Sequence, residues 1–148
     1  MADDAAVEVA EALKDALNDG SWTQTFTAAR VYDLTAELED DETVHVDVAI
    51  RVDGGEIESR GTTENDIAVD IAVRKKCDCA VATLDALMLL IQEIKDDQIG
   101  ERLSTATQGD AWCYAWERNP AYYPKHIREF RQFTGMLTLR FKLARAIP

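Results

Sequence analysis

The chain has 148 residues, of which 47% are hydrophobic and 30% are charged, a composition typical of one globular domain spanning residues 1–148. The longest apolar run, Ala86–Ile91, is too short to span a membrane, and the acidic, amphipathic first residues are unlike a signal or transit peptide. Three cysteines in a chain with no sign of export indicate free thiols in a reducing compartment.

The net charge of −12 is unevenly distributed along the chain. Residues 1–70 carry 4 Lys/Arg and 19 Asp/Glu, whereas residues 71–148 carry 12 and 9, so the net charges are −15 and +3. Residues 118–148 alone hold 7 basic residues and one acidic residue. Such polarity fits three arrangements: nucleic-acid binding by the basic part, attraction between unlike surfaces of two copies, or neutralisation within one fold.

Hydrophobic periodicity in the first half of the chain predicts one helix followed by three strands. Apolar residues at helical spacing predict a helix over residues 3–18, which Asn18–Gly20 ends. Apolar and polar residues then alternate over residues 23–32, 43–52 and 66–76, and this period of two is typical of strands with one buried face.

The second half of the chain predicts a second helix and a final strand, separated by an aromatic segment. Residues 80–99 carry an apolar stripe at helical spacing, and Gly100 ends it. A helical turn over residues 124–130 leads into a strand over residues 133–144, which alternates strictly. This closing strand is basic on its polar face, although the protein as a whole is acidic.

The order of these elements, α-β-β-β-α-β, predicts an α+β fold. The strands share an apolar face and a face of small, polar and charged residues. We therefore expect a mostly antiparallel or mixed sheet with the two main helices on one face. The other face is left open, either to solvent or to other subunits.

Aromatic residues are concentrated in the segment between the second helix and the closing strand. The hexapeptide AWCYAW alternates, which predicts that Trp112, Tyr114 and Trp116 lie on one side of an extra strand or arm. These rings either close one end of the core or form a protein–protein contact, because Trp, Tyr and Arg dominate interface hot spots.

The basic face of the closing strand predicts a charge pairing. Arg140 and Lys142 are expected to face acidic residues, either on the strands at 43–52 and 66–76 or on a second copy. The predicted interface combines these outward charges with the aromatic rings. Its residues are Asp47, Asp70, Trp112, Tyr114, Trp116, Tyr122, Tyr123, Arg128, Arg131, Arg140, Lys142 and Arg145.

Signals for catalysis or cofactor binding are weak. His45 beside Asp47 or Asp70 is one candidate constellation, but a histidine on a strand face is more commonly an ordinary solvated residue. The chain has no nucleophile elbow and no phosphate-binding loop, and its cysteines lack the C-x2-C spacing of a zinc site. The sequence therefore predicts no catalytic residue, no metal and no cofactor.

Direct reading of DNA is disfavoured by the charge distribution. The basic end and its aromatic neighbours are typical of nucleic-acid binding, but the acidic first half would repel phosphate. The basic residues of the closing strand also lie beside acidic strands.

Three stretches carry a resemblance to a known family: VAEALKDALNDGSW near the start, DIAVDIAVRKK, and the closing NPAYYPKHIREFRQFTGMLTLRFKL. Together with the element order, they resemble small proteins encoded in the structural gene clusters of tailed bacteriophages and prophages. The chain is similar to tail terminator and tail-completion proteins, which join head and tail. The resemblance covers nearly the whole chain but includes no catalytic motif, so it assigns no role to any single residue.

The resemblance implies a structural function. Tail terminators form a ring, commonly a hexamer, on the head-proximal end of the tail tube; they stop tube polymerisation and present a surface to the head connector. The implied partners are therefore further copies of the chain, the tail tube protein and head–tail connector proteins. The protein would reside in the virion, after assembly in the bacterial cytoplasm, with no membrane and no enzymatic activity.

Features of the residues agree with a ring. A cyclic ring needs two unlike patches, which the acidic first half and the basic end supply. The polar segments Asp53–Asn65 and Glu101–Pro124 are long enough to reach neighbouring subunits, and an acidic lumen would let DNA pass without binding. The alternatives are a head-completion or minor tail protein, or a small ligand-binding domain or enzyme that uses His45, Asp47 and Asp70.

Overall fold

The structure is a computed structural model, which describes residues 4–39, 43–51, 56–58, 64–107, 109–118 and 120–144. Its elements are α1 (Ala5–Asp19), β1 (Thr27–Arg30), β2 (His45–Ile50), β3 (Glu56–Glu58), β4 (Glu64–Lys76), α2 (Val81–Gln98), β5 (Arg102–Ser104), β6 (Asp110–Glu117), α3 (Pro124–Phe130) and β7 (Gln132–Ala144). The α+β class and the order of the main elements are confirmed. The short strands β3 and β5 are added to the predicted order, whereas α3 is the helical turn predicted over residues 124–130 and β6 contains the extra strand or arm predicted for AWCYAW.

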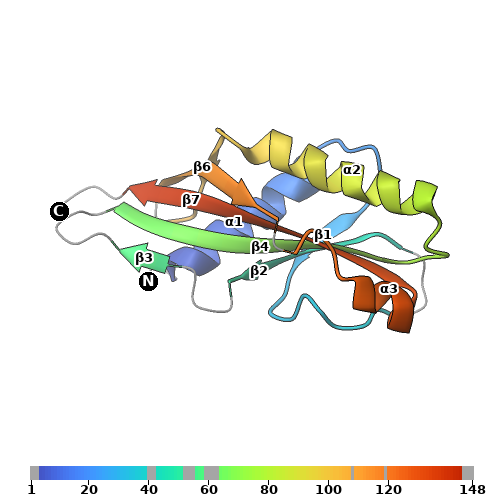
Figure 1. Ribbon diagram of the computed structural model, residues 1–148. Helices are drawn as coiled ribbons and strands as arrows, with labels where there is room; N and C mark the ends of the chain where they lie inside the picture. The colour runs from blue at the N-terminus through green and yellow to red at the C-terminus, as the bar shows by residue number, and fades with distance from the viewer. Residues whose placement is uncertain are drawn as a thin grey trace.

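All strands belong to one mixed sheet, with the order β1-β2-β4-β7-β6-β5 and β3 attached to β4 (Figure 1). The β1–β2 pair is parallel, and the other pairs are antiparallel. The centre of the sheet is the long pair β4–β7, in register from Glu64 opposite Ala144 to Lys76 opposite Gln132. The predicted closing strand is therefore an internal strand of the sheet, between β4 and β6.

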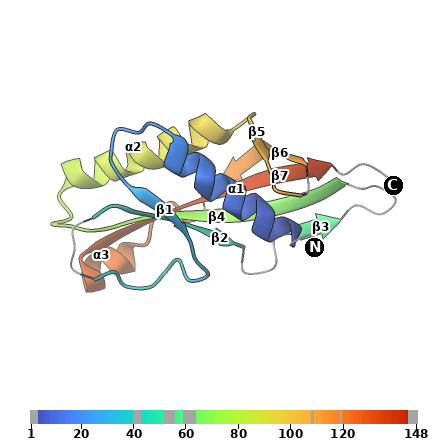
Figure 2. The ribbon, with the colours of Figure 1, turned by 180° about the vertical axis from the view of Figure 1, so that it is seen from behind.

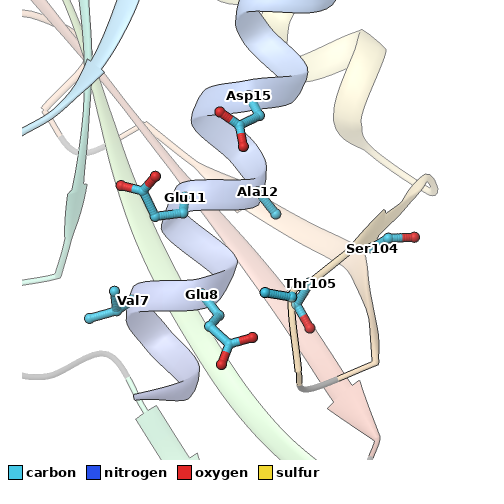
Figure 3. Close-up of a pocket in the computed structure, with 8 residues that line it drawn as sticks. Val7, Glu8, Glu11, Ala12, Asp15, Ser104 and Thr105 are labelled. Carbon is cyan, nitrogen blue, oxygen red and sulfur yellow. The ribbon is translucent and has the colours of Figure 1, made fainter. Parts of the chain in front are cut away.

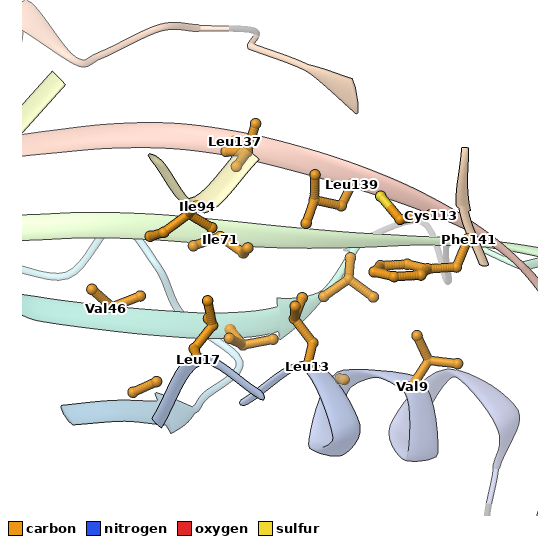
Figure 4. Close-up of a cluster of buried hydrophobic side chains, with 14 of the residues drawn as sticks. Val9, Leu13, Leu17, Val46, Ile71, Ile94, Cys113, Leu137, Leu139 and Phe141 are labelled. Carbon is orange, nitrogen blue, oxygen red and sulfur yellow. The ribbon is translucent and has the colours of Figure 1, made fainter. Parts of the chain in front are cut away.

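The helices α1 and α2 pack on one face of this sheet, which Figure 2 shows with α1 in front of the strands. Leu13 and Leu17 of α1 and Ile94 of α2 meet the apolar face of the strands, where Phe141 is also fully buried (Figure 4). Burial of each such side chain contributes about 1.5–3 kcal/mol to folding. The alternating apolar residues thus form the single large core, as their period predicts. Within the described residues, no helix is long and apolar enough to cross a membrane.

Helix α1 begins at a capping residue. The side chain of Asp4 accepts hydrogen bonds from the backbone N–H groups of Ala6 (2.9 Å) and Val7 (3.3 Å), which have no partner within the helix. Ala6 and Ala10 are buried, and their small side chains let α1 lie close to the sheet.

The face opposite the helices, called the outer face, is open over only part of its area. Residues 31–38 lie across the end of the sheet near α3, and Leu34 is buried there. Arg74 and Gln132 donate hydrogen bonds to the carbonyl oxygen of Ala36, at 2.8 and 3.3 Å. The predicted open face is therefore closed at one end, because polar outward residues of β4 and β7 hold this segment by its backbone.

The alternation predicted for the aromatic hexapeptide is wrong, because β6 contains a β-bulge. Cys113 and Ala115 pair with consecutive residues of β7, and Tyr114 is the extra residue between them. The bulge reverses the alternation, so that Trp112 and Trp116 lie on opposite faces of the sheet. Trp112 is on the outer face, whereas Trp116 is on the face of the helices.

Candidate functional site

Five side chains on the outer face of the last two long strands form the surface that we call the β6–β7 patch. It consists of Trp112, Tyr114 and Glu117 on β6 and of Arg140 and Lys142 on β7. Trp112 lies opposite Lys142, and Ala115 lies opposite Arg140, so the register brings the rings and the cations together. Four of the predicted interface residues therefore form one surface.

The rings and the ammonium group of the β6–β7 patch contact one another directly. Lys142 Nζ lies 5.0 Å from the centre of the Tyr114 ring, a distance typical of cation–π contacts. The ring centres of Trp112 and Tyr114 are 6.1 Å apart. Trp112 is still 40% exposed, so this arrangement leaves a large apolar ring available for further contact.

Tyr114 also anchors the patch to β4. Its hydroxyl donates a hydrogen bond to Asp66 Oδ2, and Asp66 lies directly opposite Lys142 in the β4–β7 pair. Burial and the neighbouring Asp66 carboxylate raise the pKa of Tyr114 to about 12. The phenol therefore stays neutral and keeps donating to Asp66 at physiological pH.

The acidic partner of Arg140 is on β6. Glu117 Oε1 lies 3.8 Å from Arg140 Nη2 and 3.2 Å from Arg51 Nη1. The acid that pairs with Arg140 thus lies on β6, and the register places Ala68 of β4 opposite Arg140. Lys142, by contrast, lies opposite Asp66 on the strand at 66–76, as expected. The partly exposed ion pairs of Glu117 are each worth about 1 kcal/mol or less.

Asp47 is a buried partner of β4 and is not part of an exposed interface. Its carboxylate binds Arg74 Nη2 at 2.5 Å and Nε at 3.2 Å, and both side chains are more than nine-tenths buried. Asp70 accepts a hydrogen bond of 2.6 Å from the hydroxyl of Thr138. The sequence offered His45 with Asp47 or Asp70 as a candidate constellation. In the structure the Asp47 carboxylate binds Arg74, which lies directly opposite His45 in the β2–β4 pair.

The other predicted interface rings are distributed over the rest of the molecule. Lys95 Nζ lies 4.6 Å from the centre of the Trp116 ring, on the side of the helices. Tyr122 stacks on Phe133 beside an apolar cavity of about 260 Å³ between α2 and α3. Tyr123 stacks on the imidazole of His126, with 5.0 Å between ring centres. The aromatic set therefore does not form one surface.

The predicted basic residues outside the closing strand lie at the end of the sheet near α3. Arg128 is in the last turn of α3, and Arg131 ends this helix in a left-handed conformation with φ of 50°. Both are exposed and lie far from the β6–β7 patch in the fold. Arg145 lies outside the described residues.

An acidic cavity of about 430 Å³ lies between α1 and the segment that follows β5. Glu8 projects from α1 toward Thr105, whereas Glu11 points to the other side of the helix (Figure 3). Glu11, Asp15 and Ser104 complete the lining. Hydrogen bonds from Lys14 and Arg30 lower the pKa of Glu11, and Glu8 accepts a hydrogen bond of 2.6 Å from the backbone of Thr107. These carboxylates are held in contacts of the fold itself. Glu8 is buried, whereas Glu11 and Asp15 remain at least partly exposed and make the surface of α1 acidic.

The described residues contain no group of three or more His, Cys, Asp and Glu side chains that could hold a metal ion. Cys113 is buried in the core near Phe141 (Figure 4), apart from the half-buried pair Cys77 and Cys79. Burial raises the pKa of the Cys113 thiol to about 11. Cys113 is therefore a core residue.

Comparison with known proteins leaves the resemblance to tail terminators as a prediction. No model of a known protein family matches this chain, and no curated protein sequence matches it. The function must accordingly be inferred from the residues, the geometry and the charge of the surfaces described above.

Proposed function

We propose that this protein is a ring-forming structural protein of a tailed-phage virion, a tail terminator that caps the head-proximal end of the tail tube. The observation that carries the proposal is the β6–β7 patch on the outer face of the sheet. Within the described residues, no helix crosses this patch (Figure 1). A half-exposed tryptophan with two flanking cations is a composition that favours a protein–protein contact.

The patch has the layout of an interface centre. Trp112 supplies a large rigid ring, and the Lys142–Tyr114 contact and the Tyr114–Asp66 hydrogen bond fix its neighbours before any partner binds. Less conformational entropy is lost on association when the contacting groups are already ordered. The surface is thus suited to repeated docking of one partner in one orientation.

A second, unlike surface on the other side of the molecule supports a cyclic arrangement. The surface of helix α1 carries three acidic residues, Glu11, Asp15 and Asp19, and one basic residue, Lys14. The helix covers the face of the sheet opposite the patch. A basic, aromatic patch on one face and an acidic helix on the other favour head-to-tail contact between copies. Such heterologous contacts close into rings when the rotation between copies is suitable.

Electron microscopy and light scattering of the purified protein test this proposal. We expect rings, either of the protein alone or at one end of tail tubes assembled from the tube protein of the same phage. Tubes grown in its presence should stop lengthening. A protein that stays monomeric with and without tubes, and leaves tube length unchanged, would exclude the proposal.

The same experiment separates the related assembly roles. A protein that forms rings but binds the isolated head connector and not the tail tube is a head-completion protein. Binding to both partners is the result expected of a terminator that joins head and tail.

A further inference from the structure

Two cysteines meet at the junction between β4 and α2. Cys77 directly follows β4, and Cys79 lies two residues before the first residue of α2. Their Sγ atoms are 3.6 Å apart, and the backbone N–H of Cys79 donates a hydrogen bond to Cys77 Sγ at 3.3 Å. Both side chains are half-buried, unlike that of Cys113.

The backbone conformation of Cys79 holds the two sulfur atoms together. Its φ of 59° is in the left-handed region, which is unfavourable for a residue with a side chain. Asp78 and the backbone of Arg131 hold the ends of this turn: Asp78 Oδ1 accepts from Ala80 N at 3.1 Å, and the N–H of Cys77 donates to Arg131 O at 3.1 Å. The sulfur atoms must approach from 3.6 Å to about 2.05 Å to form a disulfide.

The surroundings favour an anionic reagent at Cys77. This residue lines an open cavity of about 240 Å³ together with Lys75, Lys76 and Asp78. The ammonium group of Lys76 is held by Glu37 and by the carbonyl oxygen of Phe130, both at 2.7 Å. Lys75 is therefore the cation of this cavity best placed to attract a carboxylate of an incoming molecule.

We infer that Cys77 and Cys79 are a reversible oxidation site for small anionic disulfides such as glutathione disulfide. The thiolate of Cys77 attacks one sulfur of the disulfide; the S–S bond breaks, and one glutathione leaves as a thiolate and takes up a proton. The thiolate of Cys79 then attacks Cys77 Sγ and releases the second glutathione. In total two cysteine thiols are oxidised to one disulfide, and one glutathione disulfide is reduced to two glutathiones.

Cys77 is the expected attacking residue, and Cys79 is the resolving residue. Cys77 lines the cavity, and the backbone N–H of Cys79 stabilises negative charge on Cys77 Sγ during exchange. Burial and the contact with Cys77 raise the pKa of Cys79 to about 11. In the closing step Cys77 is already a mixed disulfide, so burial is the cause that still holds this pKa up. The closing step should therefore accelerate as pH rises from 7 to 9, since only the thiolate attacks.

The oxidation is measured on the folded full-length protein with graded ratios of glutathione disulfide to glutathione. After acid quenching and alkylation, mass spectrometry should find the peptide that contains Cys77 and Cys79 without the alkyl label, and lighter than the unlabelled reduced peptide by two hydrogen atoms. Cys113 should carry the label, because it stays reduced. Cys79→Ser should stop at the glutathione adduct of Cys77. Cys77→Ser should react with glutathione disulfide at least about tenfold more slowly than the wild type. Cys113→Ser should form the internal disulfide at the wild-type rate.

Two results would overturn the inference. One is a wild-type protein that accumulates stable glutathione adducts without an internal disulfide. The other is a Cys77–Cys79 pair that stays reduced under conditions that oxidise the same protein unfolded in urea. The cysteine pair follows one end of β4, and the β6–β7 patch lies beside the other end. The oxidation can therefore be measured whether or not the protein forms rings.

Discussion

Arg74 of β4 binds the carboxylate of Asp47 of β2 across the outer face of the sheet, with both side chains buried. The two guanidinium nitrogens lie 2.5 and 3.2 Å from Asp47 Oδ2, and a third donates to the carbonyl oxygen of Ala36 at 2.8 Å. The ion pair thereby fixes residues 31–38 over the sheet. Among the described residues, this segment covers the end of the outer face near α3 and does not reach the β6–β7 patch.

Asp47→Ala should destabilise the protein by about 3–5 kcal/mol, because a buried guanidinium would lose its counter-charge. Urea denaturation followed by circular dichroism measures the loss. The double variant Asp47→Leu/Arg74→Met should be much less destabilised, since neither charge is then left alone.

The exposed pair Glu11–Arg30 provides the control for Asp47. Glu11→Ala should cost about 1 kcal/mol or less, because water screens a partly exposed pair. Equal losses for Asp47→Ala and Glu11→Ala would show that the buried pair does not hold the segment.

Gly135→Ala should destabilise the protein by about 1–3 kcal/mol through overpacking. A Cβ atom at this position of β7 would lie 2.6 and 2.7 Å from ring atoms of Phe133 and against Cδ1 of Ile91. Thermal or urea unfolding measures the change.

Ile91→Val removes Cδ1, one of the atoms that obstruct this Cβ. The double variant Gly135→Ala/Ile91→Val should therefore be more stable than the sum of the two single losses predicts. Strict additivity of the losses would contradict the contact between Gly135 and Ile91.

Stability should fall below neutral pH partly because of His126. Burial, helped by the charges of Arg74 and Lys125 and opposed by that of Glu129, lowers the pKa of His126 from its usual 6.5. The unfolded state therefore binds a proton before the folded state does. The stabilisation is complete above pH 6.5 and is lost as pH falls through the lower pKa of the folded state.

His126→Gln isolates this effect, because glutamine does not titrate but can still bond to Thr134, now 2.8 Å from His126 Nδ1. Between pH 8 and pH 5, the wild type should lose more unfolding free energy than His126→Gln. Parallel pH profiles of the two proteins would refute the assignment.

Arg140→Glu/Lys142→Glu should prevent assembly while leaving the monomer folded. The change reverses the charge of the β6–β7 patch and places new carboxylates near Glu117 and Asp66. Sedimentation velocity measures assembly, and circular dichroism checks folding.

Lys75→Glu/Lys125→Glu is the matched control, because it changes the net charge equally at the other end of the sheet. It should assemble as the wild type does. If Arg140→Glu/Lys142→Glu unfolds the monomer, these cations serve within the fold and not between copies.

Much of the fold follows from the period of the sequence. Alternation over residues 66–76 and 133–144 predicts the two strands that pair as β4 and β7, and it identifies the core side of each. The helical stripes likewise predict α1 and α2 within two residues of their ends. These features are local, so a single sequence contains them.

The site was less predictable because it depends on pairing between distant segments. The bulge at Tyr114 places Trp112 and Trp116 on opposite faces of the sheet, and no residue in AWCYAW predicts a bulge. The burial of Asp47 depends on residues 31–38 crossing the sheet, a tertiary contact that polar composition does not reveal. Arg140 and Lys142 were placed on the correct face, since their position needs only the period of two.

The two tryptophans of β6 give the most direct test of the proposed ring. They are 40% and 46% exposed, on opposite faces of the sheet, so they are matched in residue type, strand and accessibility. Electron microscopy with sedimentation velocity should find rings for the wild type and Trp116→Ala, and monomers for Trp112→Ala. Rings that persist in Trp112→Ala, or a wild type that never assembles with or without tail tubes, would contradict the account.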